Sequence, residues 1–137
     1  MADALFVFMR WLHLTSMATL VGGMLVGRFV MVASENKLAP DAREAFGARA
    51  AAAYRPLVVT AIAGLLLSGT YNLLTNPGHS TLYHTLLGIK LLLALHVFAV
   101  ALLVTQPHNP RRARLMTGTV ISGLIIVAIS AYLRRIY

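Results

Sequence analysis

The sequence predicts an all-α integral membrane protein: a four-helix bundle with up-down-up-down topology, formed as a single domain over residues 1–137. Hydrophobic residues make up 58% of the 137 residues and charged residues only 12%, about half the charged share of a soluble domain. The apolar residues fall into four stretches, each near the roughly 20 residues that a helix needs to cross a bilayer. All four acidic residues lie outside these stretches: Asp3, Glu35, Asp41 and Glu44. We therefore expect a bundle interior without a carboxylate.

The four spans are expected at residues 5–32, 57–74, 82–105 and 115–133. The first span carries Arg10, His13 and Arg28, and it is too long for the apolar core of a signal peptide. We therefore expect it to be retained as a membrane helix. Each of the other three spans is bounded by proline, glycine or charged residues that mark its ends.

The connections between the spans differ in character. Residues 33–56 form a polar, alanine-rich segment, in which Pro40 starts a short helix that continues to Tyr54 before a second proline leads into the next span. Residues 76–78, Asn-Pro-Gly, predict a tight turn. Residues 106–110 contain two prolines and predict a rigid extended loop. Of the three connections, only the first is long enough to hold a helix of its own.

Lysine and arginine predict how the chain lies in the membrane, because they concentrate in cytoplasmic loops. The first loop carries Lys37, Arg43, Arg49 and Arg55. The third loop carries Arg111, Arg112 and Arg114, and the second carries no Lys or Arg. We therefore expect the first loop (residues 33–56) and the third loop in the cytoplasm, and both termini outside. The expected location is a bacterial-type cytoplasmic (inner) membrane, which the chain crosses several times. Arg134 and Arg135 at the C-terminal end oppose this orientation.

The net charge of +8 follows the same flanking pattern. Basic residues beside apolar spans are typical of membrane proteins. The expected surroundings are a lipid bilayer, and no nucleic-acid partner is expected.

Three ionisable residues lie within the apolar spans, which makes them functional-site candidates by default. A rise of 1.5 Å per residue puts His13 and Lys90 each roughly 12 Å from the outer end of their spans, and His96 roughly 21 Å. His13 and Lys90 therefore share a level, and His13 and His96 are expected to face one another across something about one ring wide. Structural roles stay open as alternatives: an interface position for His13 beside Trp11, a Lys90 side chain that reaches the headgroups, and a His96 ring bonded to a neighbouring backbone.

The first span also carries a stripe of methionines. Wrapped at 3.6 residues per turn, the stripe covers an arc of about 80°. Its members are Met9, His13, Met17, Leu20, Met24 and Met31. Thioether and imidazole groups suit Cu(I), so Met9, His13, Met17 and Met24 form an alternative copper site. Methionine also fills gaps in an apolar core, which is the interpretation we favour here.

Small residues predict close helix contacts. Gly23 and Gly27 have the G-x-x-x-G spacing of packed membrane helices. Further small residues in the spans are Gly22, Gly64, Ser68, Gly69, Gly88, Gly118, Ser122 and Gly123. Most are expected to pack helices within the chain, and the others to support a homo-oligomer or to make room for a planar ligand.

Two segments carry a family resemblance. Residues 10–13, Arg-Trp-Leu-His, followed by Gly22-Gly23, resemble the first helix of copper-resistance D (CopD) proteins and of HemJ-type protoporphyrinogen oxidases. Residues 88–93, Gly-Ile-Lys-Leu-Leu-Leu, are similar to the lysine-bearing third helix of both groups. The resemblance covers nearly the whole chain. It implies haem b inside a four-helix bundle, with His13 as an axial ligand and Lys90 as the essential, catalytic lysine.

The sequence therefore predicts an intramembrane haem (or porphyrin) protein with a redox or electron-transfer role, and it leaves open whether this is an oxidoreductase. The iron is expected between His13 and His96, with a quinol, a porphyrin or a partner cytochrome as the electron partner. Groups expected near the anionic propionates are Arg10, His84, Tyr71, Asn72 and Arg134. The alternatives are copper translocation along the methionine stripe and a non-catalytic membrane assembly subunit. Lys90 and Arg10 would repel Cu(I), which counts against the first alternative.

Overall fold

The computed structural model describes residues 1–78 and 80–136, and its regular structure over these residues is entirely helical. The first rod runs from Ala2 to Glu35 and contains α1 (Ala2–Met17), α2 (Gly23–Val26) and α3 (Val32–Glu35), separated by π-helical turns at Ala18–Gly22 and Gly27–Met31. It is followed by α4 (Pro40–Thr75), α5 (Thr81–Val104) and α6 (Arg112–Ile136). All four helices are long and apolar enough to cross a membrane. The chain is thus a multi-pass, four-helix membrane protein, as its composition predicts.

The first π-helical turn forms where a side chain from α4 inserts against the rod. The Tyr54 hydroxyl lies 2.9 Å from the carbonyl oxygen of Thr19 and 3.1 Å from that of Leu20, and donates its hydrogen to this pair. The Tyr54 ring occupies the space where a Cβ on Gly23 would stand. A side chain that inserts into the backbone ladder is one of the established causes of local helix distortion. Glycine at residue 23 is therefore required by a contact between helices.

α4 joins two elements that the sequence separates. The expected short helix and the expected second span form one helix of 36 residues, with Pro56 inside it. The alanine run before Pro56 favours a helix strongly, and Ala52 and Pro56 are both exposed, so the proline lies on an outward face of the helix. At 1.5 Å per residue α4 is about 54 Å long and α5 about 36 Å. α4 and the first rod therefore extend beyond the other two helices.

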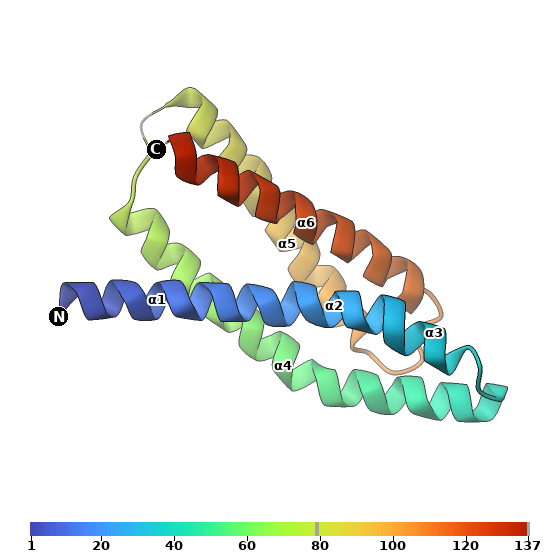
Figure 1. Cartoon of the computed structure of the whole chain (residues 1–137). Helices are drawn as coiled ribbons and strands as arrows, with labels where there is room; N and C mark the ends of the chain where they lie inside the picture. The colour runs from blue at the N-terminus through green and yellow to red at the C-terminus, as the bar shows by residue number, and fades with distance from the viewer. Residues whose placement is uncertain (79, 137) are drawn as a thin grey trace.

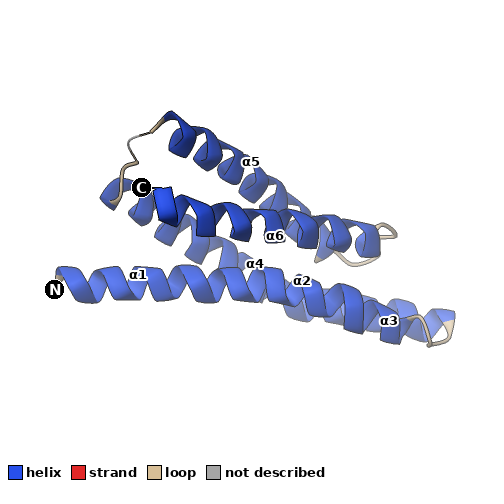
Figure 2. Cartoon of the chain, turned by 45° about the horizontal axis from the view of Figure 1, so that its top comes forward, coloured by secondary structure: helices blue, strands red, loops and turns tan. Residues whose placement is uncertain are grey.

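The helices form two pairs, the first rod with α4 and α5 with α6 (Figure 1, Figure 2). The pairs meet in what we call the packed half, where Gly27 touches Met116 and Gly123 touches Val21. The apolar core lies in this half: Leu20, Met24, Val32, Val58, Ala61, Val97, Val100, Ala101, Val104, Met116 and Val120. In the other half, here called the open half, the pairs diverge toward the end that holds both chain termini (Figure 1).

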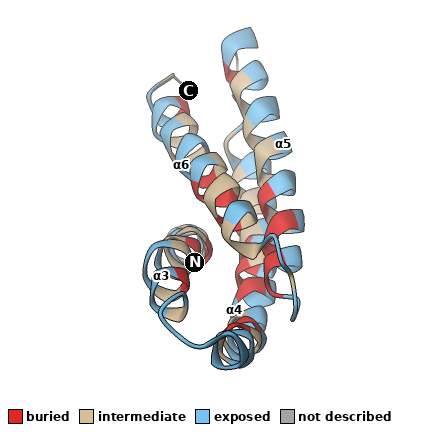
Figure 3. Ribbon diagram, turned by 90° about the vertical axis from the view of Figure 1, so that its right-hand side faces the viewer, coloured by how far each residue is buried: buried red, intermediate tan, exposed pale blue. Residues whose placement is uncertain are grey.

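Most of the apolar surface faces outward. Buried residues lie where the helices face one another, and exposed residues cover the rest (Figure 3). Only 22% of the most apolar window of each span is buried. Large apolar side chains such as Leu67, Leu92 and Leu95 are more than half exposed. A surface of this kind is suited to contact with lipid.

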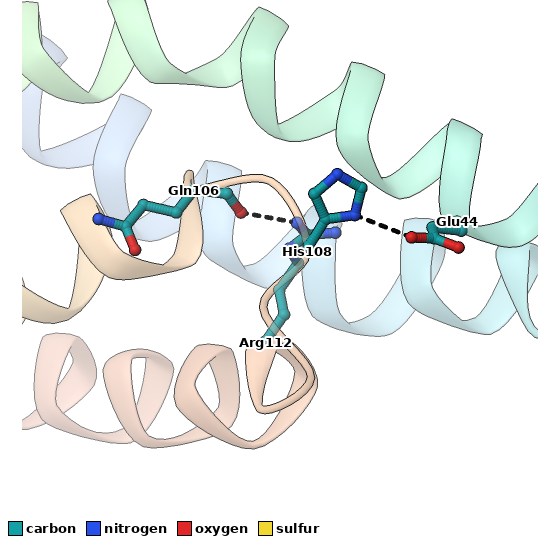
Figure 4. Close-up of polar contacts among 4 residues, drawn as sticks. All are labelled: Glu44, Gln106, His108 and Arg112. Atoms are coloured by element: carbon teal, nitrogen blue, oxygen red, sulfur yellow. Dashed lines mark hydrogen bonds and ion pairs between the residues drawn. The ribbon is translucent and has the colours of Figure 1, made fainter.

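A cluster of polar contacts, here called the polar clasp, holds the α5–α6 loop in the packed half (Figure 4). It consists of Glu44, Gln106, His108 and Arg112. Arg112 donates from Nε to the Val104 carbonyl at 3.2 Å and from Nη2 to the Gln106 carbonyl at 2.9 Å, which satisfies carbonyls at the end of α5. His108 has a positive φ of 61°, and its Nδ1 lies 2.9 Å from Glu44 Oε1 on α4. The clasp therefore ties the α5–α6 hairpin to the N-terminal part of α4.

Candidate functional site

A chain of two hydrogen bonds anchors His13 to α4. Ser68 is fully buried, and its hydroxyl donates to the Gly64 carbonyl one turn earlier at 2.6 Å. His13 Nδ1 lies 2.9 Å from the same hydroxyl oxygen. A serine hydroxyl has one hydrogen, and with that hydrogen on the Gly64 carbonyl the hydroxyl oxygen accepts from His13, whose Nδ1 then carries the proton. The neutral ring then presents its lone pair on Nε2.

Gly64 brings the two helices close enough for this bond. A Cβ at residue 64 would collide with Ser16 Oγ and lie 3.3 Å from Leu12 Cδ1. Leu12 and Ser16 flank His13 on α1, one on either side along the helix. The small residue on α4 therefore sets the distance between the helices at the level of the histidine, as close membrane contacts require.

Lys90 is the ionisable residue in the apolar span of α5. Its side chain is partly buried. No residue among 1–78 and 80–136 forms a hydrogen bond or an ion pair with its ammonium group. Lys90 is thus a cation in the middle of a membrane-length helix, with no counter-ion from the described chain.

The register of α5 explains why Lys90 faces inward. Tyr83, Lys90, Val97 and Val104 follow each other at seven-residue intervals, and the other three are buried. Residues repeating every seven positions share the face of a helix that packs in a bundle. His96 falls outside this face and is exposed. Depth along a span does not fix rotation about the helix axis, so a position for His96 opposite His13 stays a prediction.

The remaining predicted groups separate by exposure. Arg10, Tyr71 and Asn72 are half-buried in the open half, one helical turn from His13 or from the serine that holds it. His84 and Arg134 are exposed, and the ring of His84 stands edge-on to Tyr83 at 5.5 Å. Proximity along the helix therefore links the first three residues to the His13 site, and a role there for the last two stays a prediction.

The methionine stripe is divided by burial. Met24 is fully buried in the apolar core, as the packing interpretation predicts for it. Met9 and Met17 are partly buried. Within the described ranges, no three side chains of His, Cys, Asp or Glu gather closely enough to hold a metal ion.

The eight glycines of the four expected spans divide into two sets. Gly23, Gly27, Gly64 and Gly123 stand against side chains of other helices, so they serve contacts within the chain. Gly22, Gly69, Gly88 and Gly118 have no atom within 4 Å of the position of an added Cβ. No contact in the described part of the chain requires glycine at these four positions, and an oligomer built through them stays a prediction.

Ser68 is the residue whose role the sequence does not reveal. Its spacing of four residues from Gly64 indicates only a small residue at a helix contact. The signal in the sequence that could have indicated a hydrogen-bonding role is the polar Ser68 side chain within an apolar span, since a polar group in a membrane needs a partner. Comparison of the chain with protein-family models, with curated proteins and with solved structures finds no match.

Proposed function

We propose that this chain binds haem b in the open half of its bundle and uses it for electron transfer within the membrane, with Nε2 of His13 as the iron ligand. The observation that carries the proposal is the hydrogen-bonded chain from His13 Nδ1 through Ser68 to the Gly64 carbonyl. A histidine that ligates a metal through one nitrogen usually donates from the other to a fixed acceptor. Here the acceptor is a buried hydroxyl, and Nε2 is the nitrogen left with a lone pair.

The charges around the site suit the same ligand. Lys90 and Arg10 are cations on the partly buried surface of the open half, and neither has an ion-pair partner among the described residues. Two propionates on a haem would supply the missing negative charge, and hydrogen bonds to charged groups are stronger than neutral ones. Tyr71 and Asn72 add neutral hydrogen-bonding groups one turn beyond Ser68.

The proposal has one histidine ligand rather than two. His96 is exposed and lies one residue, or about 100° around α5, from buried Val97, so His13 is the one histidine ligand in this proposal. A single-histidine site fits the residues that are present, with Lys90 as a binding group for an anionic substituent.

Each group in the proposed site would have a separate role. A bound haem would supply one-electron chemistry, with a quinol, a porphyrin or a partner cytochrome as the source of electrons. Ser68 would hold the His13 ring in one tautomer, and Lys90 would orient a carboxylate. The apolar side chains around them would exclude water.

We further propose an up-down-up-down arrangement in a bacterial cytoplasmic membrane, with both termini outside. This rests on the lysines and arginines of the 33–56 and 106–114 segments and on their absence from the α4–α5 connection. The haem would then lie in the half of the membrane nearer the outer surface.

The test is the absorption spectrum of protein purified with haem supplied during expression. We expect a Soret band in the native chain and its loss in His13→Ala. His96→Ala and His84→Ala are matched controls, since each removes one exposed imidazole, and both should keep the band.

Two results would overturn the proposal. One is a normal Soret band in His13→Ala. The other is a colourless native protein that binds Cu(I) at one ion per chain, which would favour the methionine stripe instead.

A further inference from the structure

A second cationic feature lies at the opposite end of the bundle, between the first rod and α6. Arg28 donates from Nε to Thr117 Oγ1 at 2.8 Å, and that hydroxyl donates onward to the Ala113 carbonyl at 3.0 Å. The guanidinium carbon also lies 5.6 Å from the centroid of the Phe29 ring. Arg28 is thus held in place, yet the N–H groups of its two terminal nitrogens have no acceptor in the described chain.

Arg114 lies on the same face of α6 as Thr117, the residue that Arg28 contacts. It precedes Thr117 by three residues, and side chains at this spacing share one face of a helix. The contact of Gly27 with Met116 fixes the register, so Arg28 lies level with Thr117 and Arg114 lies one turn nearer the loop. Arg114 is exposed and has neither a hydrogen bond nor an ion pair with any described residue.

Two guanidinium groups therefore share one flank, with no carboxylate beside them. The one ion pair within the described chain joins His108 and Glu44. Two like charges on one flank repel each other, and an anion bound between them would relieve that repulsion. No carboxylate of the described chain lies within ion-pair distance of either arginine, so such an anion would come from outside the described chain.

The two arginines lie where the apolar part of α6 begins, the level at which lipid headgroups would meet the helix. Arg114 directly precedes Leu115, where the apolar part of α6 begins, and Arg28 lies about 4.5 Å deeper at 1.5 Å per residue. Toward the membrane interior the same face continues with Gly118, which has open space at its Cβ position, and Ile121, which is exposed. A cationic end followed by an exposed apolar surface is complementary to an anionic phospholipid, whose charged headgroup is followed by apolar acyl chains.

We propose that Arg28, Arg114 and Thr117 bind the phosphate of an anionic phospholipid whose acyl chain runs over Gly118 and Ile121. Terminal guanidinium nitrogens bind phosphate oxygens in pairs, and basic pockets between membrane helices are known sites for anionic headgroups. The site is independent of the proposed haem site, because Arg28 is 15 residues beyond His13, or about 22 Å along the rod.

The test measures lipid retention by native mass spectrometry, with the chain in detergent and phosphatidylglycerol or phosphatidylcholine added. We expect phosphatidylglycerol to bind more tightly than phosphatidylcholine. Arg28→Gln and Arg114→Gln should each weaken phosphatidylglycerol binding about fivefold, which is the contribution of one basic residue near an anionic lipid surface. Arg28→Lys keeps the charge but loses the paired geometry, so it should fall between the native chain and Arg28→Gln. Arg49→Gln is the matched control, since it removes one exposed arginine from α4, and it should stay within about twofold of the native affinity.

Three results would overturn the proposal: equal affinity for the two lipids, an equal loss in Arg49→Gln, or displacement of the lipid by millimolar inorganic phosphate, which would identify a free-anion site. If Arg28→Gln fails to fold, Arg114→Gln decides alone, because its exposed side chain has no bond to lose. His13→Ala should leave lipid retention unchanged, so failure of the haem proposal would not affect this result.

Discussion

Replacement of Ser68 by alanine tests the reasoning about His13 most directly. The change removes the hydroxyl that accepts from His13 Nδ1 at 2.9 Å and leaves the Gly64 contact free of added bulk. Hydrogen bonds between membrane helices contribute about 0.6 kcal/mol on average and up to about 1.7. Because Ser68 is fully buried, water cannot easily replace the lost bond, and we expect a loss near the upper figure.

The effect on ligand binding should be larger than the effect on folding. Without the acceptor, the ring is free to rotate and to carry its proton on either nitrogen. Loss of a group that orients a metal ligand typically lowers affinity about 10- to 100-fold, which corresponds to roughly 1.4–2.7 kcal/mol. Ser68→Thr keeps the hydroxyl and should recover most of the affinity.

The assay is a haem titration followed at the Soret band, with helix unfolding measured on the same samples. Thr70→Ala is the matched control, since Thr70 lies on the same helix, is exposed, and makes the same kind of bond to the carbonyl four residues earlier at 2.8 Å. It should bind haem like the native chain. If Ser68→Ala binds haem normally while His13→Ala does not, the tautomer argument is refuted although the ligand assignment survives.

Three further changes test the fold. Gly64→Ala pushes a methyl group into the α1 serine beside it and should cost about 1–3 kcal/mol as overpacking does, whereas Gly69→Ala has open space and should be neutral or better in the same unfolding assay. Pro56→Ala restores a backbone donor inside a continuous helix and should raise the unfolding free energy, by at most the roughly 3 kcal/mol that proline costs; a lower value would mean that the helix bends there for packing. Glu44→Gln breaks an ion pair whose partners are both about two-thirds exposed, so a loss above about 1 kcal/mol would contradict the expectation for a surface pair with His108.

The spans were predictable because membrane crossing imposes a length and a polarity that any sequence displays. Each expected span overlaps one of the four membrane-length helices, and the Asn-Pro-Gly segment at 76–78 lies in the connection between α4 and α5. The continuity of α4 through Pro56 was not predictable, because a proline between an alanine run and an apolar span usually marks a helix boundary. Its exposure, which makes the proline tolerable, is a property of the folded chain.

The site was predictable in part. His13 and Lys90 attract attention as ionisable groups in apolar spans, and both are partly buried in the structure. The outward position of His96 could not be read from the sequence. In water the polar face of a helix reveals its rotation, but in lipid the outward face of α5 is as apolar as the inward face. The inward face of α5 became identifiable only once the burial of Val97 and Val104 was known.

Lys90 connects stability with binding, and the two should respond to its removal in opposite directions. A lysine at the centre of a membrane helix costs about 2.5–3.5 kcal/mol, and Lys90 lies near the middle of α5 with no counter-ion in the described chain. Methionine has a similar length and no charge, so Lys90→Met should stabilise the ligand-free protein, by less than that figure because the native side chain is only partly buried. The same variant should bind haem more weakly, since the carboxylate loses its cation. Lys37→Met, which changes an exposed loop residue, should alter neither property. If Lys90→Met instead destabilises the ligand-free chain, then Lys90 already has a partner within the protein, and an anionic guest is not needed to explain it.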